Sequence, residues 1–230
     1  MPLRIWVVDN SGSMSAADGN RIVTTSTGAT KMVACTRWNE IQECVQYHGS
    51  LARDTQAPTA FRMLNPTSLS GKAMGMGVFG NTDFPGAYQN LFQTMQRTSP
   101  GGVTPLSRHL REIRSDVVAM QGELERKGKK VCIVLATDGL PSDEQGYSND
   151  RATNEFVQHL RSFNGLPVWV VIRLCTDEED ICDFYNNLDQ QVIHRRSERR
   201  SEYRNERRNE RENSVRENSV RGAPGLKRSA

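Results

Sequence analysis

The chain has few aromatic residues and no long hydrophobic run. Aromatic side chains make up 7% of its 230 residues. The longest apolar runs, Val131 to Ala136 and Val168 to Ile172, are far shorter than the about 20 residues that a membrane-spanning helix needs. The segment Met1 to Val8 leads directly into polar residues and lacks the pattern of a signal peptide. We therefore expect a cytoplasmic, intracellular protein with no membrane partner.

Cysteine and histidine are also scarce, and neither forms a pattern typical of catalysis or metal binding. The five cysteines are odd in number and include no CxxC pair of a zinc site, which favours buried free thiols. They are Cys35, Cys44, Cys132, Cys175 and Cys182. The four histidines form no general-base pattern, and no Gly-x-Ser-x-Gly elbow surrounds Ser11 or Ser13. We expect a protein that is not an enzyme.

Charge and composition divide the chain into two parts. Residues 1–194 hold 18 basic and 21 acidic residues, whereas residues 195–230 hold 12 basic and 6 acidic ones. The second part consists of short repeats such as Arg-Arg-Ser-Glu and Arg-Glu-Asn-Ser-Val, which offer no apolar stripe for packing. We therefore predict one domain over residues 1–194 and a disordered tail over 195–230. This basic tail is also the one part of the chain that we expect to suit nucleic acid or an acidic protein, as a scaffold would.

Short apolar segments rich in β-branched residues predict buried parallel strands over residues 3–8, 131–137 and 168–174, with a weaker candidate at 58–65. Helical spacing predicts amphipathic helices whose inner faces carry Trp38 to Ala52, Phe84 to Met95, Leu106 to Leu124, Phe156 to Phe163 and Ile181 to Leu188. Strands that alternate with helices indicate an α/β fold with a doubly wound, mostly parallel open sheet and helices on both faces.

Ligands of such sheets bind beyond the carboxyl ends of the strands. The loop after the first predicted strand, Asp9-Asn10-Ser11-Gly12-Ser13, presents one carboxylate and two hydroxyl groups at alternate positions. Hard divalent cations such as Mg²⁺ prefer oxygen ligands in a near-octahedral arrangement. The loop is therefore a candidate metal site.

At these residues the sequence resembles the von Willebrand factor type A family, whose metal-ion-dependent adhesion site joins Asp-x-Ser-x-Ser to a distant Thr and a distant Asp. Gly101-Gly102-Val103-Thr104-Pro105 and Ala136-Thr137-Asp138-Gly139 supply both in the expected order. The resemblance covers residues 3–188 and is closest to intracellular members. Members of the family usually close the sheet with one more strand and a helix. In this chain only residues 190–194 remain for such an ending before the repeats begin.

The resemblance implies a metal site with five ligands. Asp9, Ser11 and Ser13 would provide the first loop, Thr104 would bind directly, and Asp138 would bind directly or through water. The ion would be Mg²⁺, or Mn²⁺ or Ca²⁺. Its remaining position would take a Glu or Asp carboxylate of a partner protein, so the implied function is metal-dependent protein binding.

Each fragment has an ordinary structural alternative. Thr104-Pro105 is typical of a helix N-cap followed by proline at the first helical position, and the acidic residues 177–180 favour the start of a helix. An EF-hand loop that starts at Asp9 is excluded, because Met14 and Asn20 stand where it needs glycine and glutamate. The metal interpretation depends on the three fragments together.

Overall fold

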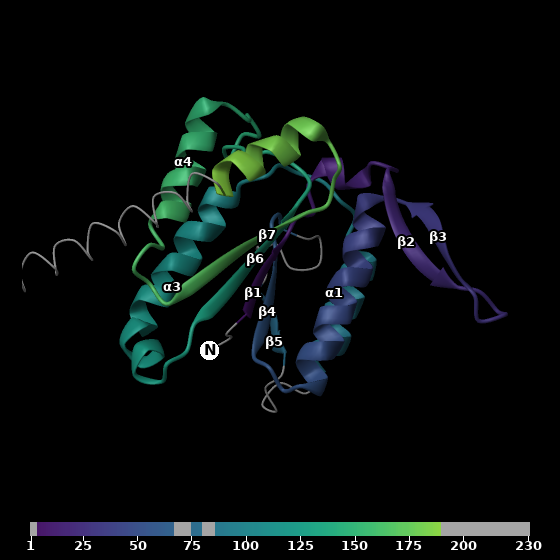
Figure 1. The fold of residues 1–230 in the computed structure, drawn as a ribbon, viewed down its shortest axis with the longest axis horizontal. Coiled ribbons are helices and arrows are strands. Elements are labelled where there is room, and N and C mark those ends of the chain that lie inside the picture. The colour runs from purple at the N-terminus through teal and green to yellow at the C-terminus, as the bar shows by residue number, and fades with distance from the viewer. Residues whose placement is uncertain (1–3, 67–74, 80–85, 190–230) are drawn as a thin grey trace, which may run out of the picture. The chain divides into compact units, whose positions relative to one another are not determined.

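Short apolar strands and amphipathic helices assemble into an α/β fold (Figure 1). The computed structural model describes residues 4–66, 75–79 and 86–189. The elements are β1 (Arg4–Val8), a 3-10 turn η1 (Gly12–Ser15), β2 (Gly19–Thr24), β3 (Thr30–Cys35), α1 (Arg37–Asp54), β4 (Thr59–Met63), β5 (Gly75–Phe79), α2 (Ala87–Arg97), α3 (Leu106–Arg126), β6 (Val131–Thr137), α4 (Asp150–Arg161) and β7 (Val168–Leu174). Residues 179–189 are also helical.

The chain divides into two compact units, Met1–Tyr185 and Asn186–Ala230. The first unit contains every labelled element. Of the second unit, residues 186–189 are described, and they are helical. The predicted tail and the segment 190–194 lie outside the described residues.

Five strands form one sheet in the order β5-β4-β1-β6-β7. The pairs β4 with β1, β1 with β6 and β6 with β7 are parallel, and β5 lies antiparallel to β4 at one edge. This confirms the predicted doubly wound, mostly parallel sheet. Along the chain the sheet grows from β1 to β4 on one side and then to β6 on the other, so the loops that follow β1 and β6 diverge at their carboxyl ends. That divergence is the place where ligands bind in open α/β sheets.

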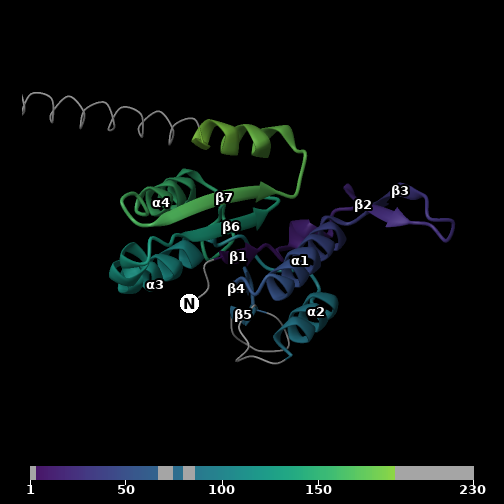
Figure 2. The same cartoon turned by 60° about the horizontal axis from the view of Figure 1, so that its bottom comes forward.

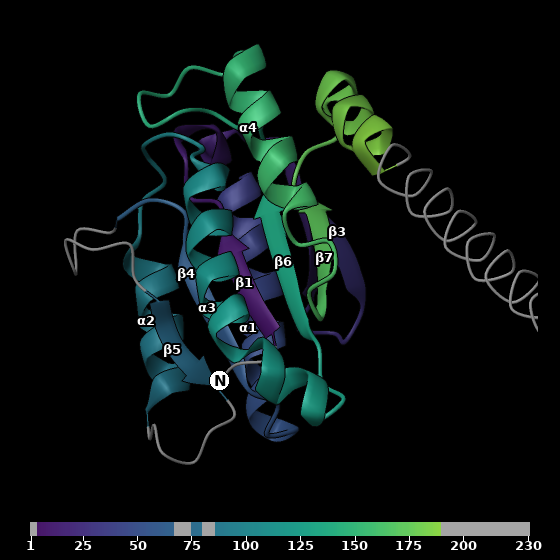
Figure 3. The same cartoon turned by 90° about the vertical axis from the view of Figure 1, so that its left-hand side faces the viewer.

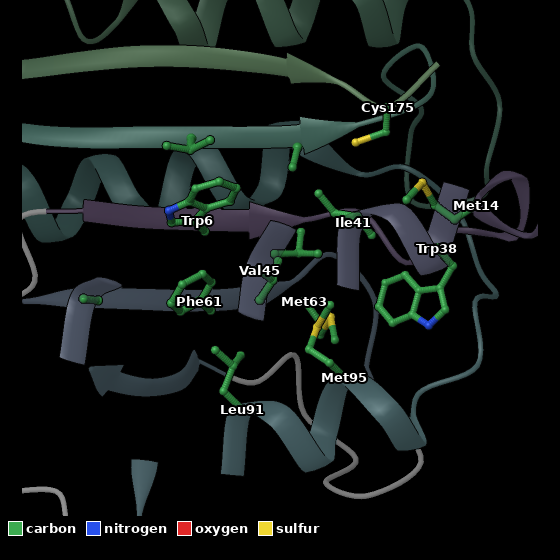
Figure 4. Close-up of a cluster of buried hydrophobic side chains, with 14 residues drawn as sticks. Trp6, Met14, Trp38, Ile41, Val45, Phe61, Met63, Leu91, Met95 and Cys175 are labelled. Carbon is green, nitrogen blue, oxygen red and sulfur yellow. The ribbon is translucent and has the colours of Figure 1, made fainter. Parts of the chain in front are cut away.

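Helices cover both faces of the sheet: α1 and α2 lie on one, and α3 and α4 on the other (Figures 2 and 3). On the first face, buried side chains of β1 and β4 meet those of α1 and α2 (Figure 4). This cluster includes Trp6, Phe61, Met63, Ile41, Val45, Leu91 and Met95. On the other face, α3 buries Leu110, Ile113 and Val117. The two apolar layers fix β1 and β6 rigidly at the centre, so their ends make a firm base for a site.

The sequence predicted most of these elements. The four predicted strands match β1, β4, β6 and β7, and the helix predicted from the spacing of Leu106 to Leu124 is α3, which ends at Arg126. On the α2 helix the predicted inner face is partly outside the described residues, since Phe84 is not among them. The α4 helix ends at Arg161, so Phe163 is buried from the turn that follows it rather than from the helix.

Two features were not predicted. The antiparallel hairpin of β2 and β3 lies between η1 and α1. Its apolar residues face solvent, as Ile22 and Met32 are 69% and 70% exposed, so no buried alternation marks these strands in the sequence. The edge strand β5 was also missed.

The cysteines are free thiols, as predicted, but four of the five are less buried than predicted. All five lie in the described part of the chain, where Cys175 is buried and the other four are half-buried. Within residues 4–66, 75–79 and 86–189, no helix is long and apolar enough to cross a membrane.

Candidate metal centre

Two aspartates lie at the ends of neighbouring parallel strands. Asp9 follows β1 and Asp138 follows β6, and the Asp9 amide donates a hydrogen bond to the carbonyl of Ala136 at 2.8 Å. Both aspartates have an exposed fraction of 0%. Charged carboxylates are rarely buried in this way without partners, because the loss of hydration is costly. The partners of each carboxylate therefore indicate what the site can hold.

The hydrogen-bond donors of Asp9 in the described part of the chain are uncharged. One carboxylate oxygen accepts from the amide of Ser11 at 2.8 Å, and the other accepts from the hydroxyl of Thr137 at 2.6 Å. Among the described residues no ion pair involves Asp9. Burial raises the pKa of Asp9 to about 6, and the nearby Asp138 charge adds to this, while the bonds from Thr137 and Ser11 oppose it. Asp9 is thus a buried carboxylate that pairs with no cationic side chain of residues 4–66, 75–79 and 86–189.

Oxygen atoms line up from the first loop to Asp138. The hydroxyl groups of Ser11 and Ser13 are 3.0 Å apart, and Ser13 donates to Oδ1 of Asp138 at 2.9 Å. Ligand oxygens at adjacent octahedral positions around Mg²⁺ are about 2.9 Å apart, since each lies about 2.0 to 2.1 Å from the ion. Ser11 and Asp138 are buried, whereas Ser13 between them is exposed, so this row of oxygens reaches solvent at Ser13.

Thr104 does not cap α3, which corrects the structural alternative. The helix begins at Leu106 with Pro105 as its N-cap and no capping side chain. The backbone of Thr104 is held by Ser142, whose hydroxyl accepts from the Thr104 amide and whose amide donates to the Thr104 carbonyl, both at 2.9 Å. No hydrogen bond of the Thr104 hydroxyl occurs within the described ranges. It faces Gly139, where an added Cβ would lie 3.8 Å from Thr104 Oγ1.

Two asparagines join the first loop to the loop that carries Thr104. The Asn10 side chain accepts from the Asn65 amide at 2.7 Å and donates to the Asn65 carbonyl at 3.2 Å. The Asn65 side chain in turn donates to the Val103 carbonyl at 2.7 Å. Gly102 has a φ of +92°, and an added Cβ there would lie 2.8 Å from the Asn65 side chain. These contacts fix where Thr104 lies relative to β1.

Arg37 is a charged residue of the site that the sequence interpretation missed. It is 4% exposed and donates from Nη1 to Oδ2 of Asp138 at 3.0 Å. Its Nε donates to Asp18 at 2.7 Å and its Nη2 to Glu178 at 2.6 Å. Hydrogen bonds to Asp18, and then to Glu178 and Asp138, hold the pKa of Arg37 above its ordinary value although burial opposes this. Glu178 lies directly before the helix of residues 179–189, as the acidic segment 177–180 predicted, and its side chain also forms this ion pair with Arg37.

One signal in the sequence could have identified Arg37. It is the first residue of α1, where the helix dipole disfavours a positive charge. A basic residue at this position is therefore unusual unless carboxylates surround it. No comparable local signal marks Asn65 or Ser142.

The side chains suit a hard divalent cation. Two buried carboxylates and three hydroxyl groups are oxygen donors of the kind that Mg²⁺ and Mn²⁺ bind. In the described part of the chain, no group of three or more His, Cys, Asp or Glu side chains could hold a metal. The predicted metal site contains only two residues of these four types, Asp9 and Asp138, and its other three ligands are hydroxyl groups.

Two solved structures are similar to this fold. One is the pilus adhesin SpaC from Lactobacillus rhamnosus GG, with 15% sequence identity and a TM-score of 0.47 over 78% of this chain and 25% of the adhesin. The other is the SpRpn10 VWA domain, with 8% identity and a TM-score of 0.34 over 80% of this chain and 93% of that domain. The chain spans about a quarter of the adhesin's length. No protein-family model and no curated protein matches the sequence.

Proposed function

We propose that this chain is a protein-binding module that holds Mg²⁺ or Mn²⁺ and uses the ion to capture a Glu or Asp carboxylate of a partner protein. The ligands in this proposal are Asp9, Ser11, Ser13, Thr104 and Asp138. No catalytic step is part of it. The domain that acts in this way comprises residues 1–194.

The observation that carries the proposal is the buried Asp9 carboxylate without a cation. Among the residues that the structure describes, its two oxygens have only uncharged donors, the Ser11 amide and the Thr137 hydroxyl. A divalent ion would supply the missing positive charge. The uncharged serine and threonine hydroxyls would hold the ion without neutralising it, so that it would still attract an external anion.

The exposure of Ser13, in the middle of the row of oxygens, supports a partner rather than a purely structural ion. Ser13 is exposed, whereas Asp9, Ser11 and Asp138 are buried. A partner carboxylate would therefore approach from the side of Ser13.

The first test is thermal unfolding with Mg²⁺ or Mn²⁺ and with EDTA. A ligand that binds only the folded protein stabilises it by about 2.7 kcal/mol at a concentration 100 times its Kd, so the melting temperature should rise with metal. The rise should disappear in Asp9→Asn and shrink in Ser13→Ala. Ser15→Ala is the matched control, because Ser15 is an exposed serine of the same turn. Equal melting with metal and with EDTA would contradict the proposal.

A second test separates the domain from the tail. An affinity purification is run on the full chain and on a variant that lacks residues 195–230, each with Mg²⁺ and with EDTA. Capture that survives the deletion and is lost with EDTA supports the metal site. Capture that is lost with the deletion and insensitive to EDTA supports the scaffold alternative, in which the tail binds the partner.

A further inference from the structure

Arg37 occupies a position that its helix alone would not favour. It is the first residue of α1, where a positive charge opposes the helix dipole. It is nevertheless 4% exposed, and its amide donates to the Ala16 carbonyl beyond η1 at 3.0 Å. Gly19 permits this close approach, since an added Cβ would lie 2.9 Å from the Arg37 nitrogen. Tertiary contacts with carboxylates, rather than helix formation, must therefore hold the guanidinium in place.

The three carboxylates around Arg37 differ in burial. The side chains of Asp18 and Glu178 are 54% and 57% exposed, so water and salt screen their charges. Asp138 is fully buried, and its Oδ2 accepts from Arg37 while its Oδ1 accepts from Ser13. The buried charges are thus Asp9 and Asp138, both negative, and Arg37, positive. Their sum is one negative charge.

We propose that Arg37 is a positioning residue of the metal site, which holds Oδ2 of Asp138 and neutralises that carboxylate. This inference rests on the proposed function. A divalent ion placed among these residues meets a net charge of minus one instead of minus two. The ion therefore binds less tightly than it would to the same two carboxylates without Arg37. It also keeps a net positive charge, which attracts the carboxylate of a partner.

This role predicts an unusual effect of removing the arginine. Arg37→Gln changes the buried charge to minus two, so Mn²⁺ should bind at least tenfold more tightly, because charges a few ångströms apart interact strongly at partly buried sites. The captured carboxylate should bind more weakly at the same time. A merely structural role predicts that both kinds of binding weaken together.

A charge cycle with Asp138 tests this directly. Asp138→Asn brings the buried charge to zero and should weaken Mn²⁺ binding at least tenfold. The double variant Arg37→Gln with Asp138→Asn restores a charge of minus one and should bind Mn²⁺ within about threefold of the wild type. It leaves Asp138 uncharged and Asp9 with the same neighbours as in the wild type, so it creates no new unpaired buried charge and remains informative if Arg37→Gln alone does not fold. Arg37→Lys keeps the charge and should resemble the wild type.

The measurements are the Mn²⁺ affinity by calorimetry on the full chain and the binding of acetate to the Mn²⁺-loaded protein by water-proton relaxation. Arg62→Gln is the matched control, since Arg62 of β4 pairs with the exposed carboxylates of Glu112 and Asp116 on α3 and its loss should change neither affinity. The expected order of Mn²⁺ affinity is Arg37→Gln first, then the wild type together with the double variant, then Asp138→Asn.

Two results would overturn the inference, and they differ from failure of the proposed function. Weaker Mn²⁺ binding by Arg37→Gln in a folded protein would show that Arg37 does not limit the charge of the site. A double variant no better than Asp138→Asn would show the same. Absence of Mn²⁺ binding by the wild type would instead overturn the proposed function, and this role of Arg37 with it.

Discussion

Asp9→Asn should make the metal-free protein more stable, although it removes a residue proposed to bind the metal. Burial raises the pKa of Asp9 from 3.8 to about 6. Such a rise means that the folded protein favours the protonated carboxyl by about 3 kcal/mol relative to the unfolded chain. Asparagine resembles the protonated form. Its carbonyl can still accept from Ser11, and its NH₂ group can donate to Thr137 after the threonine hydroxyl rotates.

The sign of the pH dependence follows from the direction of the shift. The stability that a protonated Asp9 provides is fully present below the unfolded pKa of 3.8, and it is lost as the pH rises through about 6. The variant should therefore exceed the wild type by about 1 to 3 kcal/mol at pH 7.5, and by less than about 1 kcal/mol at pH 4.

Urea unfolding in EDTA at the two pH values measures this difference. Asp54→Asn is the control, because Asp54 is exposed and pairs only with its neighbour Arg53 among the described residues, so the change should lie within about 0.5 kcal/mol. A variant that is no more stable than the wild type at pH 7.5 would refute the reasoning. It would mean that Asp9 has a counter-ion, or is hydrated, in the metal-free protein.

Three further predictions concern the residues around the site. Gly102→Ala should destabilise the protein by more than about 1 kcal/mol in urea unfolding, because the φ of +92° at Gly102 and its contact with Asn65 leave no room for a Cβ. The same change should reduce the stabilisation by Mg²⁺. Unchanged stabilisation by Mg²⁺ would show that this loop does not position Thr104. Phe61→Ala should cost about 3 to 5 kcal/mol, because Phe61 is fully buried in the core, and a loss below about 1 kcal/mol would contradict that packing. Cys175 should react with iodoacetamide at pH 8 only after unfolding, because burial raises the pKa of its thiol to about 12; rapid alkylation in the native state, located by mass spectrometry, would contradict this.

Local patterns in the sequence were sufficient for most of the fold. The strands β1, β6 and β7 are short β-branched apolar segments, and α3 follows the helical spacing of Leu106 to Leu124. Such features depend on neighbouring residues, because hydrophobic periodicity and capping act over a few positions. The hairpin of β2 and β3 escaped prediction because its strands bury no regular face of the sheet.

The candidate ligands could be named from the sequence because they come from loops with recognisable chemistry at strand ends. The contacts that surround these ligands could not be predicted from the sequence. Thr104 was also a plausible helix cap, and only the start of α3 at Leu106 shows that its hydroxyl has no capping role. Nothing local to Asn65 indicates its bonds with the Asn10 side chain and with the Val103 carbonyl, which hold two loops together.

By itself, the sequence determined the α/β alternation, the Asp-x-Ser-x-Ser loop and the order of the fragments that carry the proposed ligands. Tertiary structure alone decided the charge of the site. Arg37 is separated from Asp138 by 101 positions and from Glu178 by 141, and it meets both only because β1 and β6 are neighbours and the loop after β7 returns toward α1. Burial then decides which of these charges matter, because Asp138 is removed from water while Asp18 and Glu178 remain screened by it.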